Sequence, residues 1–157
     1  MFLSIFSLTT FMAKLKVVKF EDYKEGDSAS HSKTISDEDV ELFAKVSGDF
    51  NPIHMDEEFA KTQMYGKRIV HGAFSSALIS AVLGVKLFGP GAIYASQEVR
   101  FQGPAFIGDT LTAVATVKKK YTKQGKSGEL KFLDVETKVF NQNDELLTDG
   151  MAKVLIM

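Results

Sequence analysis

The chain has 157 residues, enough for one domain with a sizeable hydrophobic core. Hydrophobic residues make up 45% of it and charged residues 25%, a balance typical of soluble globular proteins. The formal net charge of -1 implies no general attraction to nucleic acid, and the absence of cysteine excludes disulfides, thiolate nucleophiles and cysteine-type metal sites.

Residues 1–13 are expected to be an N-terminal extension of uncertain role, ahead of a single domain over residues 14–157. The extension carries no charge, so it lacks the basic region of a secretory signal, and it is too short to span a bilayer. Translation could start at Met1 or at Met12. Organelle targeting is the alternative, but targeting peptides favour arginine and this stretch has none. The expected location is the cytoplasm, with the mitochondrion as the alternative and no membrane association.

Lys14 to Phe20 is expected to be a short strand or an extended lead-in. Ser30 to Ile35, where apolar and polar residues alternate weakly, is expected to be an edge strand. Ser36 then opens the sequence Ser-Asp-Glu-Asp, which resembles a helix capping box with acidic residues in the first turn. Apolar residues follow at helical spacing, which predicts a short helix. This helix is predicted to end at Gly48. Beyond the next segment, Asp56 is expected to cap a further helical turn.

The segment from Ser47 to His54 reads Ser-Gly-Asp-Phe-Asn-Pro-Ile-His and is the candidate site. Gly48 and the Asn-Pro pair make regular structure unlikely here. Asp49 and His54 would lie roughly 140° apart around a helix and on opposite faces of a strand, so only a turn brings them together. Such a pair can perform general acid–base chemistry, since imidazole titrates near neutrality. The alternative is that Asp49 caps a turn and His54 is an ordinary hydrogen-bonded residue.

Residues 72–85 contain no charged side chain, which predicts a helix surrounded by protein. Gly72 stands at its N-terminus, where unpaired backbone N–H groups and the helix dipole favour developing negative charge. These are the properties of an oxyanion hole, but Gly72 could equally serve close packing while His71 caps the helix. A structural role is favoured for His71. Ser76 and Ser80 share one helix face, and Ser80 could bond its own i−4 carbonyl or reach the candidate loop.

Four strands are predicted after this helix, separated by turns rich in glycine: Ala92 to Gln102, Thr110 to Lys120, Leu130 to Phe140 and Leu146 to Ile156. Alternation in the first strand puts Tyr94 on its polar face. It puts Gln97 on the face of the apolar side chains, which are Ile93, Ala95, Val99 and Phe101. A buried amide needs hydrogen-bond partners, either structural or from a ligand. The pattern predicts an α+β fold, with an antiparallel sheet curled around one buried helix.

Three motifs in this order resemble the MaoC-like (R)-specific enoyl-CoA hydratases and 3-hydroxyacyl-thioester dehydratases of the hotdog-fold group. They are Gly48 to His54, Gly66 to Gly72 and Tyr94 to Gln97, and the likeness extends over about residues 30–155. The resemblance implies a hotdog fold, a curved antiparallel sheet wrapped around a long central helix. It also implies a homodimer, or a higher homo-oligomer, in which the sheets of two subunits join.

The resemblance further implies reversible syn hydration of a trans-2-enoyl thioester to the (R)-3-hydroxyacyl thioester. Asp49 and His54 match the catalytic pair, and either could be the base, with His54 preferred. Gly72 matches the residue whose backbone N–H binds the thioester oxygen, and Ser80 matches a hydroxyl near the catalytic loop. The remaining candidates for substrate binding are Asn51, His71 and Gln97. Ala73 departs from the Met that many relatives carry, which affects only the expected acyl chain length.

The reaction that the resemblance implies requires no metal and no redox cofactor, so none is expected. Coenzyme A or an acyl carrier protein enters as part of the substrate. An acyl-CoA thioesterase is the alternative enzyme, since hotdog folds host both activities. A non-catalytic acyl-thioester binding module is the alternative outside catalysis. The run from Lys118 to Lys120 could contact coenzyme A phosphates, although lysines at a strand end more often form a solvated face.

Overall fold

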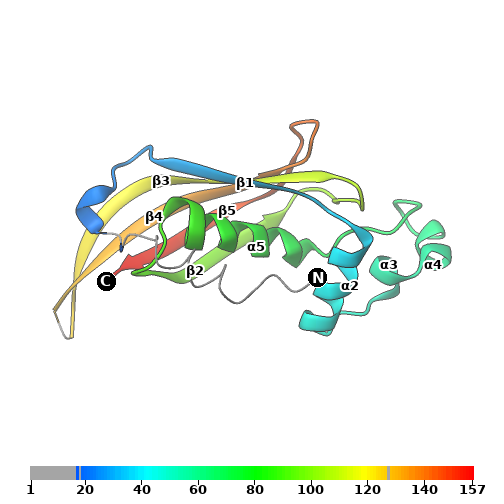
Figure 1. Ribbon diagram of the computed structural model, residues 1–157, viewed down its shortest axis with the longest axis horizontal. Helices are drawn as coiled ribbons and strands as arrows, with labels where there is room; N and C mark the ends of the chain where they lie inside the picture. Colours follow the sequence, from blue (N-terminus) through cyan, green and yellow to red (C-terminus); the bar gives the residue numbers. More distant parts are fainter. Residues whose placement is uncertain (1–16, 18, 127) are drawn as a thin grey trace, which may run out of the picture.

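Five antiparallel strands form one curved sheet around a central helix in the computed structural model, which describes residues 17, 19–126 and 128–157 (Figure 1). The predicted extension over residues 1–13 lies outside the described residues. The sheet order is β1-β3-β4-β5-β2, with β1 Ser28–Thr34, β2 Ala92–Phe101, β3 Thr110–Gly125, β4 Gly128–Phe140 and β5 Leu146–Ile156. A short 3-10 helix, η1, covers Phe20–Asp22. The α+β hotdog architecture expected from the sequence is confirmed.

Strands β3 and β4 form the centre of the core, as their alternation predicts. Leu111, Ala113, Ala115 and Val117 of β3 all point inward and are at most 1% exposed. On β4, Leu133 and Val135 are likewise fully buried. Because successive side chains of a strand face opposite sides, every second residue faces the central helix and the rest face outward.

Strand β2 departs from the prediction at a β-bulge. Tyr94 pairs with Val154 and Ser96 pairs with Lys153, so Ala95 is an extra residue without a partner on β5. The extra residue reverses the alternation, and Tyr94 therefore shares the inner face with Gln97, to which its hydroxyl donates a hydrogen bond. The expected inner positions of Ile93 and Ala95 are wrong for this reason.

The central helix, α5, runs over Gly72–Ala81 and continues as a π-helical segment, η2, over Val82–Leu87. Its buried side packs against the sheet through Phe74, Leu78 and Ile79. The opposite side is exposed, so the prediction of a helix surrounded by protein is wrong for a single chain. The exposed residues are Gly72, Ala73, Ala77 and Ser80, which are small and mostly apolar and so give no polar signal of exposure. No helix in the described ranges is long and apolar enough to span a bilayer.

Three short helices lie beyond the N-terminal end of α5, outside the concave sheet (Figure 1). They are α2 Asp37–Ser47, α3 Pro52–Met55 and α4 Glu57–Lys61. The predicted capping box is present at α2: the Ser36 hydroxyl accepts from the Asp39 N–H at 3.2 Å, and the Asp39 carboxylate accepts from the Ser36 N–H at 2.9 Å. Asp56 caps α4 as expected, accepting from the Phe59 N–H.

Candidate active site

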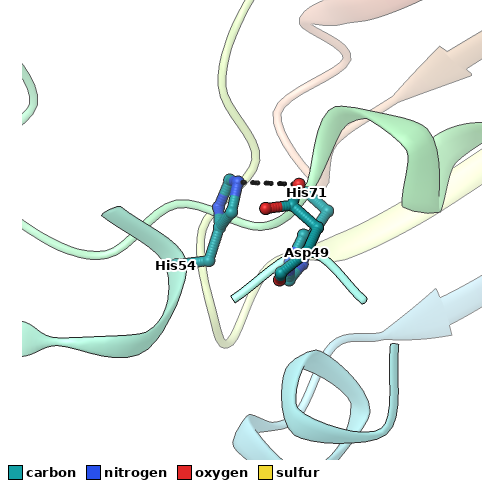
Figure 2. A group of neighbouring side chains, drawn as sticks. All are labelled: Asp49, His54 and His71. Carbon is teal, nitrogen blue, oxygen red and sulfur yellow. Dashed lines mark hydrogen bonds and ion pairs between the residues drawn. The ribbon is translucent and has the colours of Figure 1, made fainter. Parts of the chain in front are cut away.

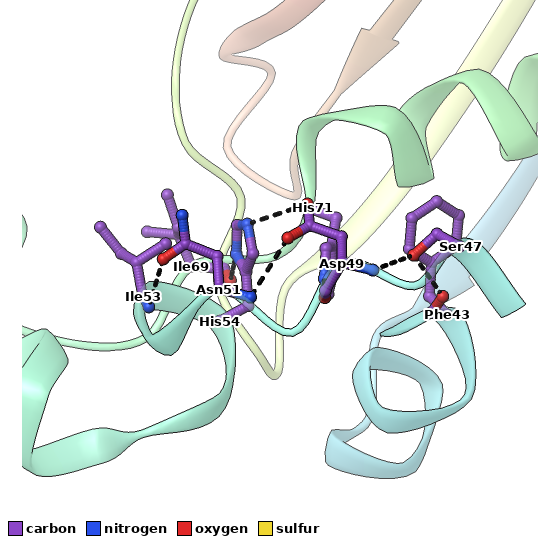
Figure 3. Close-up of polar contacts among 8 residues, drawn as sticks. All are labelled: Phe43, Ser47, Asp49, Asn51, Ile53, His54, Ile69 and His71. Carbon is purple, nitrogen blue, oxygen red and sulfur yellow. Dashed lines mark hydrogen bonds and ion pairs between the residues drawn. The ribbon is translucent and has the colours of Figure 1, made fainter. Parts of the chain in front are cut away.

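The candidate loop begins where α2 ends. Gly48 adopts φ +80°, a left-handed conformation that glycine reaches without strain, and its N–H donates to the Ala44 carbonyl at 2.8 Å. The Ser47 hydroxyl donates to the Phe43 carbonyl at 2.7 Å and accepts from the Asp49 N–H at 3.2 Å. These bonds turn the chain sharply and present Asp49 immediately after the helix (Figure 3).

A second turn follows at Asn51 and is helical. The Asn51 side chain accepts from the Ile53 N–H at 3.1 Å, and Pro52 occupies the first helical position. Asparagine is a good N-cap, and proline is favoured at the first position because its fixed φ suits a helix start. The expectation that regular structure is unlikely here is therefore wrong for residues 52–55. The helical turn is what brings His54 back toward Asp49.

Asp49 and His54 converge, as the predicted turn requires (Figure 2). His54 is 8% exposed, and its Nε2 lies 3.9 Å from Oδ2 of the half-exposed Asp49. His54 Nδ1 contacts the Ile69 carbonyl at 2.8 Å, and a carbonyl can only accept, so Nδ1 carries the hydrogen. In the neutral ring, Nε2 is then an acceptor facing a carboxylate. A water molecule beside the line that joins these two atoms can lie within hydrogen-bond distance of both and donate one hydrogen to each.

The surroundings of His54 favour its neutral form. Burial is the largest influence and lowers the pKa of His54 below its ordinary value. The bond to the Ile69 carbonyl opposes this effect, His71 adds to it, and the Asp49 carboxylate opposes it. With its pKa lowered, His54 is available as a base at neutral pH.

Gly72 lies at the first position of α5, beside this pair. The first N–H groups of a helix have no intrahelical acceptor and point toward whatever lies beyond the helix end. A cavity of about 240 Å³ opens there, and its lining includes His71, Gly72, Ser75 and Phe101. A Cβ at Gly72 would lie 3.4 Å from the Phe101 ring, so glycine keeps this space open and lets a ligand approach the backbone. An oxygen bound in this cavity can therefore accept a hydrogen bond from the helix N-terminus.

His71 does not cap α5, although it is the N-cap residue. Its ring is 2% exposed and turns instead to the candidate loop, where Nε2 lies 2.9 Å from the Asp49 backbone oxygen. The rings of His71 and His54 stack with centroids 3.9 Å apart. The expected structural role, satisfied by a backbone group, fits this bond, but the expected capping is wrong.

Ser80 is not brought to the candidate loop within one chain. It lies two helical turns beyond Gly72, about 12 Å along the axis at the usual rise of an α-helix. There it lines a separate cavity of about 50 Å³, with Leu83, Tyr94 and Val154.

Gln97 is also remote from the loop and is held by strand residues. Its side-chain oxygen accepts from the Tyr94 hydroxyl at 2.6 Å, and its nitrogen donates to the buried Thr137 hydroxyl at 2.9 Å. The same nitrogen donates to the Glu98 carbonyl at 2.7 Å. The bond to Thr137 ties β2 to β4 across β5, and the three bonds together supply the partners that this half-buried amide needs.

Sequence reasoning missed two participants in the site. Ile69 acts through its backbone carbonyl, and every residue type has such a carbonyl, so no side-chain pattern could reveal it. Phe43 packs its ring against His71, with centroids 5.1 Å apart. Its helical spacing marked it only as an apolar residue of α2.

Asp49, His54 and His71 each offer a possible metal-ligand atom, and these atoms lie within 4.8 Å of one another. The geometry suits proton transfer better than chelation. The two imidazole rings are stacked at 30°, so their lone pairs run side by side instead of converging, and one nitrogen of each ring is already bonded to a carbonyl.

The lysine run lies at the opposite end of the molecule from α2, α3 and α4, on the far part of β3 (Figure 1). Lys118 pairs with Glu136 at 3.6 Å, and Lys120 donates to the Tyr23 carbonyl at 2.8 Å. These local contacts agree with a solvated face instead of a phosphate site near the loop.

Comparison with known proteins finds relatives that align over most of the chain. The (R)-specific enoyl-CoA hydratase of Rhodospirillum rubrum is 45% identical over 137 residues, which are 87% of this chain and 90% of that protein. The 3-hydroxybutyryl-CoA dehydratase of Methylorubrum extorquens is 38% identical over 145 residues, covering 92% of this chain and 88% of that protein. The unliganded R-hydratase PhaJ1 from Pseudomonas aeruginosa has a TM-score of 0.79 at 37% identity, covering 87% of this chain and 84% of that one.

The family comparison covers most of the chain. The family described as MaoC like domain matches residues 20–139. This range spans η1, the candidate loop, α5 and the strands β1 to β4, apart from the last residue of β4. The relatives above align over most of their own length as well. The chain therefore belongs to the MaoC like domain family.

Proposed function

We propose that the protein catalyses reversible syn hydration of a trans-2-enoyl thioester to the (R)-3-hydroxyacyl thioester, as a hydro-lyase. The observation that carries this proposal is the convergence of Asp49 and His54 beside the N-terminus of α5, with Nε2 and Oδ2 3.9 Å apart. The names of the relatives support the same reaction and a coenzyme A thioester. An acyl carrier protein thioester is the alternative substrate.

In the proposed mechanism the thioester oxygen accepts a hydrogen bond from the Gly72 N–H. When water attacks C3, negative charge builds on that oxygen, and the helix N-terminus stabilises it. Gly72 suits this role because the cavity reaches its backbone. The stabilisation acts on the transition state more than on the substrate, which is what accelerates the reaction.

His54 and Asp49 hold the attacking water between them. His54 Nε2 takes one proton from the water while the hydroxyl adds to C3, and the Asp49 carboxylate stabilises the imidazolium that forms. The pair then delivers a proton to C2 on the same side, so one water is added in total and the enzyme returns to its starting state. The hydrogen bond from Nδ1 to the Ile69 carbonyl supports His54 as the base, because it leaves Nε2 as the acceptor.

The first experiment is hydration of crotonyl-CoA and longer enoyl-CoA thioesters, followed by loss of ultraviolet absorbance and chiral analysis of the product. The expected result is loss of the enoyl chromophore with formation of the (R)-alcohol and no free thiol. Release of coenzyme A, detected with a thiol reagent, would establish the thioesterase instead. Binding of every thioester without turnover would establish the non-catalytic module.

The proposed steps use only side chains and backbone groups of the chain. We therefore expect turnover to be unchanged after dialysis against a chelator. Loss of activity that added metal restores would contradict a cofactor-free mechanism.

We further propose a homodimer. Strand β2 is an edge of the sheet, with one side unpaired in a single chain. It exposes Ile93 at 41%, Tyr94 at 38% and Phe101 at 56%, and such an edge readily pairs with another strand. Sedimentation equilibrium should give twice the chain mass, and a monomer at micromolar concentration would contradict the proposal.

The cytoplasm is the proposed location, supported by the absence of cysteine, which fits a reducing compartment. Fractionation of the native host should recover the protein with cytoplasmic markers. Recovery with mitochondria would establish the alternative.

A further inference from the structure

His71 contacts both members of the Asp49–His54 pair, and these contacts differ in kind. Its Nε2 lies 2.9 Å from the Asp49 backbone oxygen. Since a carbonyl oxygen only accepts, the His71 ring donates from Nε2. This bond ties the main chain of the candidate loop to the residue that immediately precedes α5, the helix that carries the Gly72 N–H (Figure 3).

The contact with His54 is a stack of rings. The two centroids are 3.9 Å apart and the ring planes differ by 30°. Phe43 contacts the His71 ring as well, at 5.1 Å between centroids, so His71 itself is held in place. With Nδ1 anchored on the Ile69 carbonyl and one face against His71, the His54 imidazole has a fixed plane and a fixed Nε2 direction.

Packing alone would not require a histidine at this position. Nδ1 of His71 is buried, and it has no hydrogen-bond partner in the described part of the chain. A buried polar atom without a partner is unfavourable, so an apolar ring of similar size would pack here at lower cost. What histidine supplies beyond such a ring is the N–H that reaches the Asp49 carbonyl.

We propose that His71 is a positioning residue for the proposed hydration, placing the Asp49 carboxylate through its main chain and the His54 imidazole through ring stacking. This inference rests on the proposed function, because it assigns a role in that reaction. In this role the transferred proton moves on His54 and Asp49, and His71 acts only through the groups that it holds. Its effect on rate comes from holding two groups in one geometry, and small displacements of such groups reduce turnover strongly.

Two variants separate the two contacts. His71→Gln keeps an N–H at about the distance of Nε2 but removes the ring, and His71→Phe keeps a ring but removes the donor. Leu78→Ala is the matched control, since Leu78 lies on α5, the helix that follows His71, and is buried in the hydrophobic core. Each folded protein is assayed for kcat and KM on crotonyl-CoA across pH, with the folded fraction measured by circular dichroism.

We expect both His71 variants to lose about 10- to 100-fold in kcat per folded molecule, with a smaller change in KM. His71→Gln should also move the acid limb of the kcat/KM profile to higher pH. The stacked ring buries His54, and burial is the main cause of its lowered pKa, so removing the ring raises that pKa. Asp49 and His71 are the titratable groups that influence His54 among the described residues. His71→Phe keeps the ring and removes only the lesser, charge-based influence of His71 on that pKa, so its limb should move less than that of His71→Gln. Leu78→Ala should leave the limb in place.

Titration of the His54 ring by NMR tests the same geometry without turnover. The pKa of His54 should rise in His71→Gln relative to the parent protein. An unchanged titration, or losses of kcat that match the lost folded fraction as in Leu78→Ala, would overturn the positioning role. An inactive parent protein would instead overturn the proposed function, and the NMR titration would still decide whether His71 sets the environment of His54.

Discussion

The central strands and the site segment, defined as residues 37–71, are built on different principles. Over residues 111–117 of β3 and 133–139 of β4 every second side chain is buried, and all of these buried side chains except Thr137 are aliphatic. In the site segment six side chains are buried: Val40, Ala44, His54, Ala60, Val70 and His71. Two of these six are the stacked histidines. The segment is therefore held largely by directional contacts, namely caps, hydrogen bonds to carbonyls and ring stacking.

Together with the proposed function, this difference predicts that stability and rate depend on separate parts of one small domain. Burial in the sheet is non-directional and tolerates exchange between similar side chains. The contacts in the site segment depend on particular atoms, such as the Asn51 side-chain oxygen and the Ile69 carbonyl. Substitutions in the sheet should lower stability at constant chemistry, and substitutions in the segment should lower rate at nearly constant stability.

The sharpest test of the segment is removal of the acid–base groups. Asp49→Asn and His54→Asn should each lower hydration of crotonyl-CoA by about 10²- to 10⁴-fold, the usual contribution of general acid–base catalysis. An asparagine at position 54 can keep a donor near the Ile69 carbonyl, so the fold is retained. Glu58→Gln, an exposed change in the same segment, is the control and should keep full activity. Near-normal rates in both site variants would contradict the assignment.

The corresponding test of the sheet is Leu133→Ala. Leu133 is fully buried on β4, and truncation of such a leucine leaves a cavity that destabilises the fold by about 2–5 kcal/mol. Urea unfolding should show this loss, while kcat per folded molecule stays unchanged. Leu130→Ala on the same strand is the control, because Leu130 is 39% exposed and should lose far less. If Leu133→Ala reduced kcat as strongly as stability, the separation of the two regions would fail.

A smaller effect is expected at the junction of the two regions. Ser36→Ala removes the hydroxyl that caps α2 and should lower the unfolding free energy by about 1 kcal/mol. Ser30→Ala is matched to it, since Ser30 is exposed on β1 and its hydroxyl has no hydrogen bond within the described residues. Equal stability of the two variants in urea would show that the cap contributes nothing.

The smallest expected effect concerns pH. Burial lowers the pKa of His54 from its ordinary value of 6.5. Protonation of Nε2 is therefore shifted to a pH below 6.5. As pH falls through the lowered pKa, Nε2 gains a proton and can no longer accept one from water. The acid limb of the kcat/KM profile should therefore lie below pH 6.5 and be missing from the residual activity of His54→Asn. A limb above pH 6.5 would mean that Asp49 outweighs burial.

Periodicity predicted the sheet well because the central strands alternate regularly over residues 111–117 and 133–139, and the register shift in β3 comes only after Val117. Strand β5 covers Leu146–Ile156 as expected, and β3 and β4 extend beyond the predicted bounds only at their shared hairpin. The prediction failed on β2, where one added residue reverses the alternation. It also failed on the open side of α5, because the small residues there look as apolar as a buried face.

The site was partly predictable for a different reason. Spacing showed that Asp49 and His54 needed a turn to meet, and the resemblance to a family supplied their roles, which remain a proposal. The arrangement of His71 was not foreseen, since a residue at a helix start is ordinarily expected to cap it. Its actual partner is a backbone oxygen 22 positions away, which no local pattern reports.

The bulge at Ala95 has a consequence for insertions and deletions. On either side of it, Tyr94 and Gln97 face inward, three positions apart instead of two. Deletion of Ala95 would restore ordinary alternation and leave both of these side chains on the inner face. Chains of this family that are one residue shorter in this strand can therefore keep the same side chains on the inner face. A sequence alignment that places the gap elsewhere in the strand would assign some of these side chains to the wrong face.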